Sequence, residues 1–331
     1  MTTLLEIKDL MTVFDTSRGL IKAVDGVSLG VAHGETLGVV GESGCGKTML
    51  ALSIMRLVPG SGRIVNGKIL FSGMDLLTLS PEEMRAKRGS EISMIFQEPM
   101  TSLNPVFRVG EQIAEAIRLH QKVSAKSAME MAVEQLREVG IPCPEKRARN
   151  YPHQLSGGMR QRVMIAMAMS CHPQLLLADE PTTALDVTIQ AQILELIFEL
   201  KQKNKMTVIL ITHDLGVIAQ AAQKVAVMYA GKIMENAPVD KIFANPMHPY
   251  TRGLIESMPA ALAKENDAPE DLLKTIPGAV PALYNLSPGC RFYERCSYAD
   301  ARCARQEPAL EETGNNHYVA CWKAREIIEK E

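Results

Sequence analysis

The sequence has little excess charge and no long apolar run. Its formal net charge is −2, so it lacks the basic surplus of a typical nucleic-acid-binding protein. Apolar stretches such as residues 163–169 are far shorter than the ~18 residues that a membrane-spanning helix needs. The N-terminus shows no basic region followed by an apolar segment, which argues against a signal peptide. We therefore expect a cytosolic protein that reaches a membrane only through its partners.

The cysteines also do not indicate a framework of disulfide bonds. Seven cysteines occur in 331 residues, and proteins of a reducing compartment do not rely on disulfides. Cys45, Cys143 and Cys171 are scattered, and the other four gather near the C-terminus. The remaining composition, 46% apolar and 22% charged, is that of an ordinary globular chain. Its length has room for about two domains.

The strongest chemical signal is a glycine-rich stretch at residues 39–50. Gly41, Gly46, Lys47 and Thr48 fit the phosphate-loop pattern G-x-x-x-x-G-K-[ST] between a buried strand and a helix. A helix terminus alone supplies only about 0.3–1 kcal/mol. Backbone N–H groups, the lysine ammonium and a Mg²⁺ held by the threonine hydroxyl must therefore share the binding of a polyphosphate. The alternative, a plain strand–helix turn with a surface lysine, explains less of the complete motif.

Hydrophobic periodicity predicts an α/β chain with a helical insertion. Alternation typical of β-strands runs through residues 4–40, and further strands are predicted at 66–72, 92–96, 175–179 and 208–212. A helix is predicted at 188–203, and a hairpin at 225–235. From about residue 98 to 155 the chain becomes helical, with an apolar stripe that we assign to the core: Met129, Ala132, Val133, Leu136 and Val139. Strand, helix, strand is the order that places ligands at one edge of a parallel sheet.

Two further groups of polar residues stand where chemistry is expected. Ser156 can cap the helix that follows it, and Gly157 and Gly158 leave the first N–H groups of that helix uncovered, which makes a second anion site. Asp179 and Glu180 end an apolar strand. A surface role for Glu180 is the alternative, but an acid beside another at a strand end is placed for catalysis.

These motifs together resemble the ATP-binding subunits of ABC transporters, over residues 4–237. Six motifs occur in the order of that family, and chance assembly of all six is negligible. They are Walker A at Gly41–Thr48, the Q-loop glutamine Gln97, the signature at Leu155–Arg160, Walker B at Leu175–Asp179 followed by Glu180, the D-loop at Ala184–Asp186 and the switch histidine His213. Met159 stands where the family usually has glutamine, which affects only a side-chain contact with nucleotide.

The resemblance implies a fold and a domain organisation. The fold is an α/β P-loop NTPase with a RecA-like core, an N-terminal antiparallel β subdomain, a helical ABC subdomain and a small C-terminal module that contains cysteines. We expect the ABC ATPase domain at residues 1–240, with its helical subdomain at about 98–165, and the C-terminal module at residues 241–331.

The resemblance also implies a Mg-ATP site. Lys47 would bind the β- and γ-phosphates, and Thr48 would hold Mg²⁺. Asp179 would hold the same ion through water, and Gln97 would sense the metal and the attacking water. The remaining contacts of Walker A and the D-loop with the nucleotide would come from Gly41, Glu42, Ser43, Gly44, Cys45, Gly46 and Asp186.

Catalytic and closing roles follow from the same resemblance. Glu180 would polarise the attacking water, and His213 would contact the γ-phosphate. Phe14, on an expected loop edge, resembles the aromatic residue that stacks on adenine, with core packing as the alternative. One phosphate loop and one signature cannot complete a site in this family, so two cassettes pair head to tail around two ATPs. The residues that would close over the ATP of another subunit are Ser156, Gly157 and Gly158.

The C-terminal part narrows the family to the importers of oligopeptides, dipeptides and nickel. Residues 245–251, with Leu254, Ser257 and Pro259, resemble a motif of this branch, as do residues 100–105. The branch implies a homologous second ATPase subunit, two membrane permeases, an extracytoplasmic binding protein and a place on the cytoplasmic face of the inner membrane. No nucleic-acid partner is expected. His248 and Tyr250 are interpreted as packing residues.

The sequence favours peptide import over several other functions. Dipeptides are the favoured cargo, but the sequence does not separate them from oligopeptides, nickel or another small cargo. A soluble ABC ATPase of ribosomes or DNA usually has two cassettes, long coiled-coil insertions or basic surfaces, and this chain has none of these. A module that senses ATP without turnover is disfavoured because Glu180 and His213 are both present.

The four C-terminal cysteines predict a metal centre. Cys290, Cys296, Cys303 and Cys321 have the spacing C-x5-C-x6-C-x17-C. Four soft sulfur ligands favour zinc or an iron–sulfur cluster, and structural zinc sites usually use close C-x₂₋₄-C pairs, which this spacing lacks. We therefore expect a structural [4Fe–4S] cluster, with Zn²⁺ or four reduced thiols as the alternatives.

Overall fold

The computed structural model describes the chain except for residues 1, 99–101, 184, 259–274, 285 and 329–331. Its residues form two compact units. Unit 1 consists of Met1–Thr2, Ala32–Glu35 and Thr78–Ile209, and unit 2 consists of Thr3–Val31, Thr36–Leu77 and Leu210–Glu331. The units follow packing rather than chain order, so the residues beyond 240 are grouped with the N-terminal strands.

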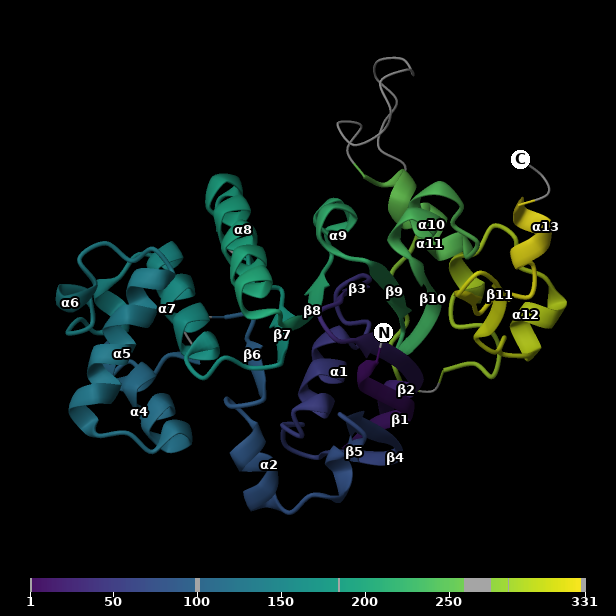
Figure 1. Ribbon diagram of the computed structural model, residues 1–331. Helices are drawn as coiled ribbons and strands as arrows, with labels where there is room; N and C mark the ends of the chain where they lie inside the picture. Colours follow the sequence, from purple (N-terminus) through teal and green to yellow (C-terminus); the bar gives the residue numbers. More distant parts are fainter. Residues whose placement is uncertain (1, 99–101, 184, 259–274, 285, 329–331) are drawn as a thin grey trace. The chain divides into compact units, whose positions relative to one another are not determined.

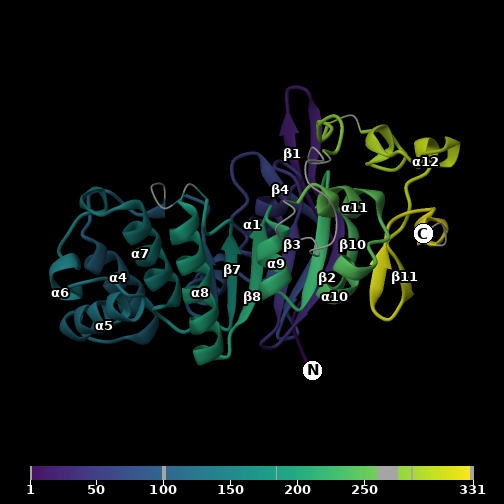
Figure 2. The same ribbon diagram turned by 90° about the horizontal axis from the view of Figure 1, so that it is seen from above.

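The N-terminal part of unit 2 is an antiparallel sheet. Its four strands are β1 (Thr3–Thr16), β2 (Gly19–Ala32), β4 (Gly62–Phe71) and β5 (Met74–Asp75), in the order β2-β1-β4-β5. Strands β1 and β4 pair antiparallel over most of their length and lie side by side in Figure 2. The β-type alternation predicted for residues 4–40 is confirmed, and β2 is continuous through Gly26, which adopts a φ of +68°.

The second sheet of unit 2 carries the phosphate loop. Strand β3 (Thr36–Val40) is buried along its whole length and runs parallel to β9 (Lys224–Tyr229). Beyond β9 the sheet continues antiparallel with β10 (Lys232–Pro238), β12 (His317–Val319) and β11 (Glu311–Gly314). The C-terminal strands β12 and β11 therefore extend the sheet whose strand β3 leads into the phosphate loop.

Short helices complete unit 2 (Figure 1). They are α1 (Lys47–Ile54), α9 (Leu215–Ala221), α10 (Val239–Ala244), α11 (Pro249–Glu256), α12 (Ala301–Arg305) and α13 (Ala324–Ile328). Helix α9 packs on β3, where a Cβ atom added at Gly38 would lie 2.7 Å from the Ile218 side chain. Glycine at this position brings the helix close to the strand.

Unit 1 combines parallel strands with a group of helices. Strand β6 (Ile92–Ile95) runs parallel to β7 (Leu175–Asp179). Its helices are α2 (Pro81–Lys87), α4 (Val109–Gln121), α5 (Ala125–Glu138), α6 (Pro144–Arg147), α7 (Gly157–Met169) and α8 (Val187–Asn204), and β8 (Thr207–Thr212) begins in unit 1 and ends in unit 2.

The helices of unit 1 confirm part of the sequence pattern. The predicted apolar stripe lies on α5, where Ala132 and Leu136 are buried. Helix α2 was not predicted, although Ser80 and Glu83 form a capping box at its start. None of the described helices is both long and apolar enough to cross a membrane.

Candidate nucleotide-binding site

The phosphate loop lies between β3 and α1 in unit 2, as its motif predicts. Gly46 has a φ of +107°, and a Cβ atom added there would lie 2.2 Å from the carbonyl oxygen of Ala23. A Cβ atom at Gly41 would lie 2.1 Å from the carbonyl oxygen of Met228. Real Cβ atoms do not approach backbone oxygens so closely, so both positions require glycine, because the loop passes directly over the neighbouring strands.

Lys47 lies within the loop that precedes it. Its side chain is buried, and Nζ donates hydrogen bonds to the carbonyl oxygens of Gly41, at 2.7 Å, and Glu42, at 3.1 Å. The sulfur of Cys45 lies 3.9 Å from the same nitrogen. Burial raises the pKa of the Cys45 thiol, although the lysine opposes that change. The cation of the motif is thus held among polar atoms of its own loop, beside Thr48 at the start of α1.

The carboxylates predicted for metal binding and water activation lie in unit 1. Asp179 is the last residue of β7 and is 1% exposed. Glu180 follows with a φ of +43°, a conformation that non-glycine residues adopt rarely and at a cost of about 1–3 kcal/mol. Its Oε2 accepts hydrogen bonds from Thr183 Oγ1, at 3.0 Å, and from Gln97 Nε2, at 3.1 Å. We call Gln97, Asp179, Glu180 and Thr183 the acidic corner.

This geometry directs the Glu180 side chain rather than leaving it as a surface acid. Gln97 follows β6 and is exposed, and it comes from a segment 83 residues away in the chain. The two predicted catalytic residues Gln97 and Glu180 are therefore in direct contact. Thr183 is a further member of the corner that the sequence analysis missed, although its position three residues after Glu180 is typical of a local side-chain hydrogen bond.

The signature segment also lies in unit 1 and has the predicted cap. Ser156 is the N-cap of α7, and its Oγ accepts a hydrogen bond from the N–H of Met159 at 3.3 Å. Gly157 and Gly158 form the first turn, and a Cβ atom at Gly158 would lie 3.1 Å from Ile189. The glycines thus permit close packing against α8 and leave the start of α7 without side chains.

The remaining predicted residues are placed as follows. Asp186 is the N-cap of α8, because its Oδ1 accepts a hydrogen bond from the N–H of Ile189 at 3.0 Å, and Ala184 lies outside the described residues. His213 is exposed directly after β8. Phe14 lies within β1 rather than on a loop edge, and its ring covers Gly62 of β4, where an added Cβ atom would lie 2.5 Å from the ring. Phe14 is half-buried, so it packs against β4 without being fully enclosed.

The four C-terminal cysteines line one pocket of unit 2, together with His248 and Phe292. Burial raises the pKa of Cys290 to about 11 and of Cys321 to about 12, and it also raises the pKa of Cys296. These shifts are opposed by backbone hydrogen bonds from the residues two positions further along the chain. Among the described residues, no group of three or more histidine, cysteine or acidic side chains is close enough to hold a single metal ion.

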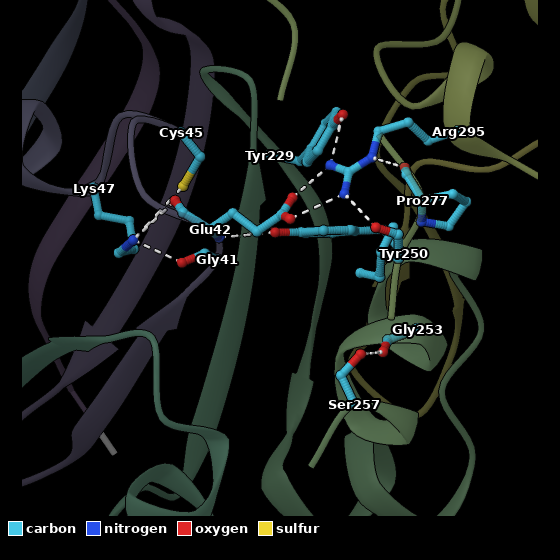
Figure 3. A network of polar contacts seen from close by, with 11 residues as sticks. Gly41, Glu42, Cys45, Lys47, Tyr229, Tyr250, Gly253, Ser257, Pro277 and Arg295 are labelled. Carbon is cyan, nitrogen blue, oxygen red and sulfur yellow. Dashed lines mark hydrogen bonds and ion pairs between the residues drawn. The ribbon is translucent and has the colours of Figure 1, made fainter. Parts of the chain in front are cut away.

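The C-terminal residues also reach the phosphate loop (Figure 3). Tyr250, at the start of α11, accepts a hydrogen bond at its hydroxyl from the N–H of Glu42 at 2.9 Å. The Arg295 guanidinium binds both carboxylate oxygens of Glu42, at 2.5 and 2.9 Å. Packing alone was predicted for Tyr250, and Arg295 was not singled out. No local motif marks such contacts, because the partners are 208 and 253 residues apart.

Comparison with known sequences finds two matching regions, an ABC cassette and a transporter-specific C-terminal region. The ABC transporter family matches residues 24–183, and the oligopeptide/dipeptide transporter C-terminal region matches residues 234–303. The probable peptide ABC transporter ATP-binding protein y4tR of Sinorhizobium fredii is 52% identical over 98% of this chain and 96% of its own. The oligopeptide transport ATP-binding protein OppD of Bacillus subtilis is 52% identical over 97% of this chain and 89% of its own.

A solved structure agrees with the cassette part. The ATP-binding cassette MJ0796, in a dimeric post-hydrolysis state bound to ADP and Pi, is similar with a TM-score of 0.64 and 26% identity. The match covers 71% of this chain and 98% of that one. The expected α/β P-loop fold is therefore confirmed.

Proposed function

Since this chain belongs to the ATP-binding proteins of peptide ABC transporters, we propose that it hydrolyses Mg-ATP to drive the import of dipeptides or oligopeptides through membrane permeases. The observation that carries the proposal is the similarity along nearly the whole chain, which includes both the cassette and the transporter-specific C-terminal region. A soluble ABC ATPase without a transport role would not need that second region. Nickel or another small cargo remains the alternative within transport.

The proposed chemistry divides between two sets of residues. Lys47 and the loop N–H groups bind the phosphates. Thr48 would provide an oxygen ligand for Mg²⁺, a hard cation that prefers oxygen, and Asp179 would hold the same ion through water. Asp179 ends β7 and is 1% exposed, so its carboxylate lies at the end of a buried strand, a position that fits this role. When bound at these residues, Mg²⁺ would neutralise the charge that develops on the phosphates.

Hydrolysis requires a water directed at the γ-phosphate. Glu180 accepts its proton, and the bond from Gln97 fixes the orientation of that carboxylate. His213 donates to the departing γ-phosphate. Phe14 stacks on adenine with the ring face that Gly62 does not cover. The other loop residues and Asp186 complete the nucleotide contacts.

The proposed assembly is a sandwich of two cassettes. Ser156, Gly157 and Gly158 close over the ATP of a homologous partner ATPase, since the described chain has one phosphate loop and one signature. The dimeric state of the similar cassette MJ0796 supports this arrangement. Two permeases, fed by an extracytoplasmic peptide-binding protein, would hold both ATPases at the cytoplasmic face of the membrane. Residues 1–240 would form the ATPase domain, with its helical subdomain at about 98–165, and residues 241–331 would form the transporter-specific module.

The proposed function is tested by ATP turnover of the complex. We would co-express the chain with its partner ATPase and permeases and measure phosphate release. Lys47→Ala should lower the rate by about 10²-fold or more, because a preorganised donor to the phosphates is lost. Lys8→Ala, at an exposed lysine, is the control. A fast rate from the isolated monomeric chain would contradict the sandwich, and absence of ATP turnover by the complex would refute the function.

The C-terminal pocket is proposed to hold a [4Fe–4S] cluster on Cys290, Cys296, Cys303 and Cys321. Their common pocket and the backbone hydrogen bonds toward three of the sulfurs support this assignment. A single Zn²⁺ fits less well, since the described residues contain no three histidine, cysteine or acidic side chains close enough to hold one ion. When bound, the cluster would act as a structural staple, because ATP hydrolysis involves no redox step.

Elemental analysis after anaerobic purification tests the cluster. About four irons and four sulfides per chain are expected. Cys303→Ser should abolish both, and Cys143→Ser, at an exposed scattered cysteine, should change neither. One zinc without iron would replace the cluster by the alternative metal, and neither metal would refute a metal centre.

A further inference from the structure

Arg295, in the C-terminal part of the chain, binds the phosphate loop, and each of its guanidinium nitrogens donates a hydrogen bond. Nη1 and Nη2 of Arg295 donate to the Glu42 carboxylate, and the same two nitrogens also donate to Tyr229 Oη and to the carbonyl oxygen of Ile276, each at 3.3 Å. Nε donates to the carbonyl oxygen of Pro277 at 2.8 Å. All three nitrogens thus have acceptors, and the side chain is 5% exposed. A guanidinium held this completely has one available geometry.

A tyrosine fixes the main chain of the same loop residue. The Tyr250 side chain is fully buried, and its hydroxyl accepts the hydrogen bond from the N–H of Glu42. Its ring contacts those of Tyr229, at 4.6 Å, and Phe292, at 5.4 Å between centroids. Such aromatic packing leaves the hydroxyl little freedom to follow a moving loop.

Glu42 therefore connects three groups. Tyr250 holds its N–H, Arg295 holds its carboxylate, and its carbonyl oxygen accepts a hydrogen bond from the Lys47 ammonium. Figure 3 shows these groups in one row, with Glu42 between Lys47 and Arg295. The side chain that binds phosphate is thus two contacts away from the C-terminal module.

We propose that Arg295 and Tyr250 are positioning residues for ATP, which hold the phosphate loop in its binding shape through Glu42. The inference rests on the proposed ATPase function and deepens it, since it assigns the C-terminal module a part in nucleotide affinity. The contacts that carry this role are those with Glu42, not a contact with the nucleotide. A loop held before ATP arrives loses less entropy when ATP binds, so the two residues raise affinity without a contact of their own.

The experiment measures the Kd of the full chain for ATP and the KM and kcat of the assembled complex. Arg295→Ala should raise Kd and KM about tenfold, and Tyr250→Phe about threefold, with kcat changed by less than about twofold, because ground-state binding is affected. Arg302→Ala is the matched control, since its guanidinium lies over the Trp322 ring, 3.5 Å from the centroid, in the same module. It should leave all three constants unchanged.

A double-mutant cycle separates positioning from general stability. Glu42→Gln removes the carboxylate charge, so Arg295→Ala should add little to Kd in that background. Additive effects, or a Kd of Arg295→Ala and Tyr250→Phe equal to that of the wild type, would overturn the inference while the ATPase function stands. If Arg295→Ala does not fold, Tyr250→Phe decides, because it removes one hydroxyl only. A wild-type chain that does not bind ATP would instead refute the proposed function.

Discussion

The phosphate loop and the acidic corner are held in place in different ways. The loop residue Glu42 is bound by Tyr250 and Arg295, which lie more than 200 residues further along the chain. Glu180 of the acidic corner is bound by Thr183, three residues away, and by Gln97 of the same unit. Each set of contacts lies within a single unit, but the loop depends on residues far away in the sequence, and the corner depends on residues that are nearer.

This difference separates two properties of the enzyme. Contacts with the remote C-terminal residues act on the loop proposed to bind phosphate, so their loss should appear in affinity for ATP. Contacts inside the acidic corner act on Glu180, the residue proposed to activate water, so their loss should appear in turnover. Each of the following substitutions tests one side of the comparison.

The largest effect is expected from Glu180→Gln. Glutamine keeps the size and the hydrogen bonds of the residue but cannot accept a proton from water, and general-base assistance is worth about 10²–10⁴-fold. Phosphate release by the complex should fall by that factor while Kd for ATP stays unchanged. Glu195→Gln, at an exposed position of α8, is the control. Turnover close to that of the wild type would remove Glu180 from catalysis.

An intermediate effect is expected from Gly46→Ala in the loop. The new Cβ atom would collide with the Ala23 carbonyl oxygen, and a positive φ disfavours alanine. The free energy of unfolding should fall by about 1–3 kcal/mol and Kd for ATP should rise at least about tenfold. Gly26→Ala is the control, because Gly26 also has a positive φ but no heavy atom lies within 4 Å of a Cβ atom added there. Equal losses of ATP affinity in both variants would show that the close approach is unimportant.

The smallest effect is expected from Thr183→Val. The substitution removes one hydrogen bond to the Glu180 carboxylate, so kcat should fall by about three- to tenfold with KM unchanged. Thr182→Val is a neighbouring control. A rise of KM instead would contradict the division between the acidic corner and the phosphate loop.

Much of this arrangement could be predicted from sequence because its contacts are local. The glycines and lysine of the phosphate loop, the Ser156 cap and the acids after β7 lie in continuous motifs, and their local structure follows from backbone geometry. The resemblance to a known family implied a role for Gln97 and a role for Glu180, but their direct contact was not predicted. Helix α2 was missed because a charged surface stretch conceals a capping box.

The contacts of the C-terminal residues could not be predicted in this way. Tyr250 lies on α11 and Arg295 precedes α12, and no periodicity in the sequence encodes the contacts of these two residues with Glu42. Residues beyond 240 are grouped with the N-terminal strands in unit 2.

The position of the Lys47 ammonium has a consequence for ligand choice. It donates to two carbonyl oxygens of its own loop, so any ligand must offer a better acceptor before the lysine changes partners. A phosphate oxygen carries full negative charge and forms the stronger, charge-assisted bond. A hydroxyl or a neutral carbonyl offers no gain over the acceptors already present. Under the proposed role of Lys47, we therefore expect the loop to favour a phosphorylated nucleotide over an unphosphorylated nucleoside, whatever the contacts of the base.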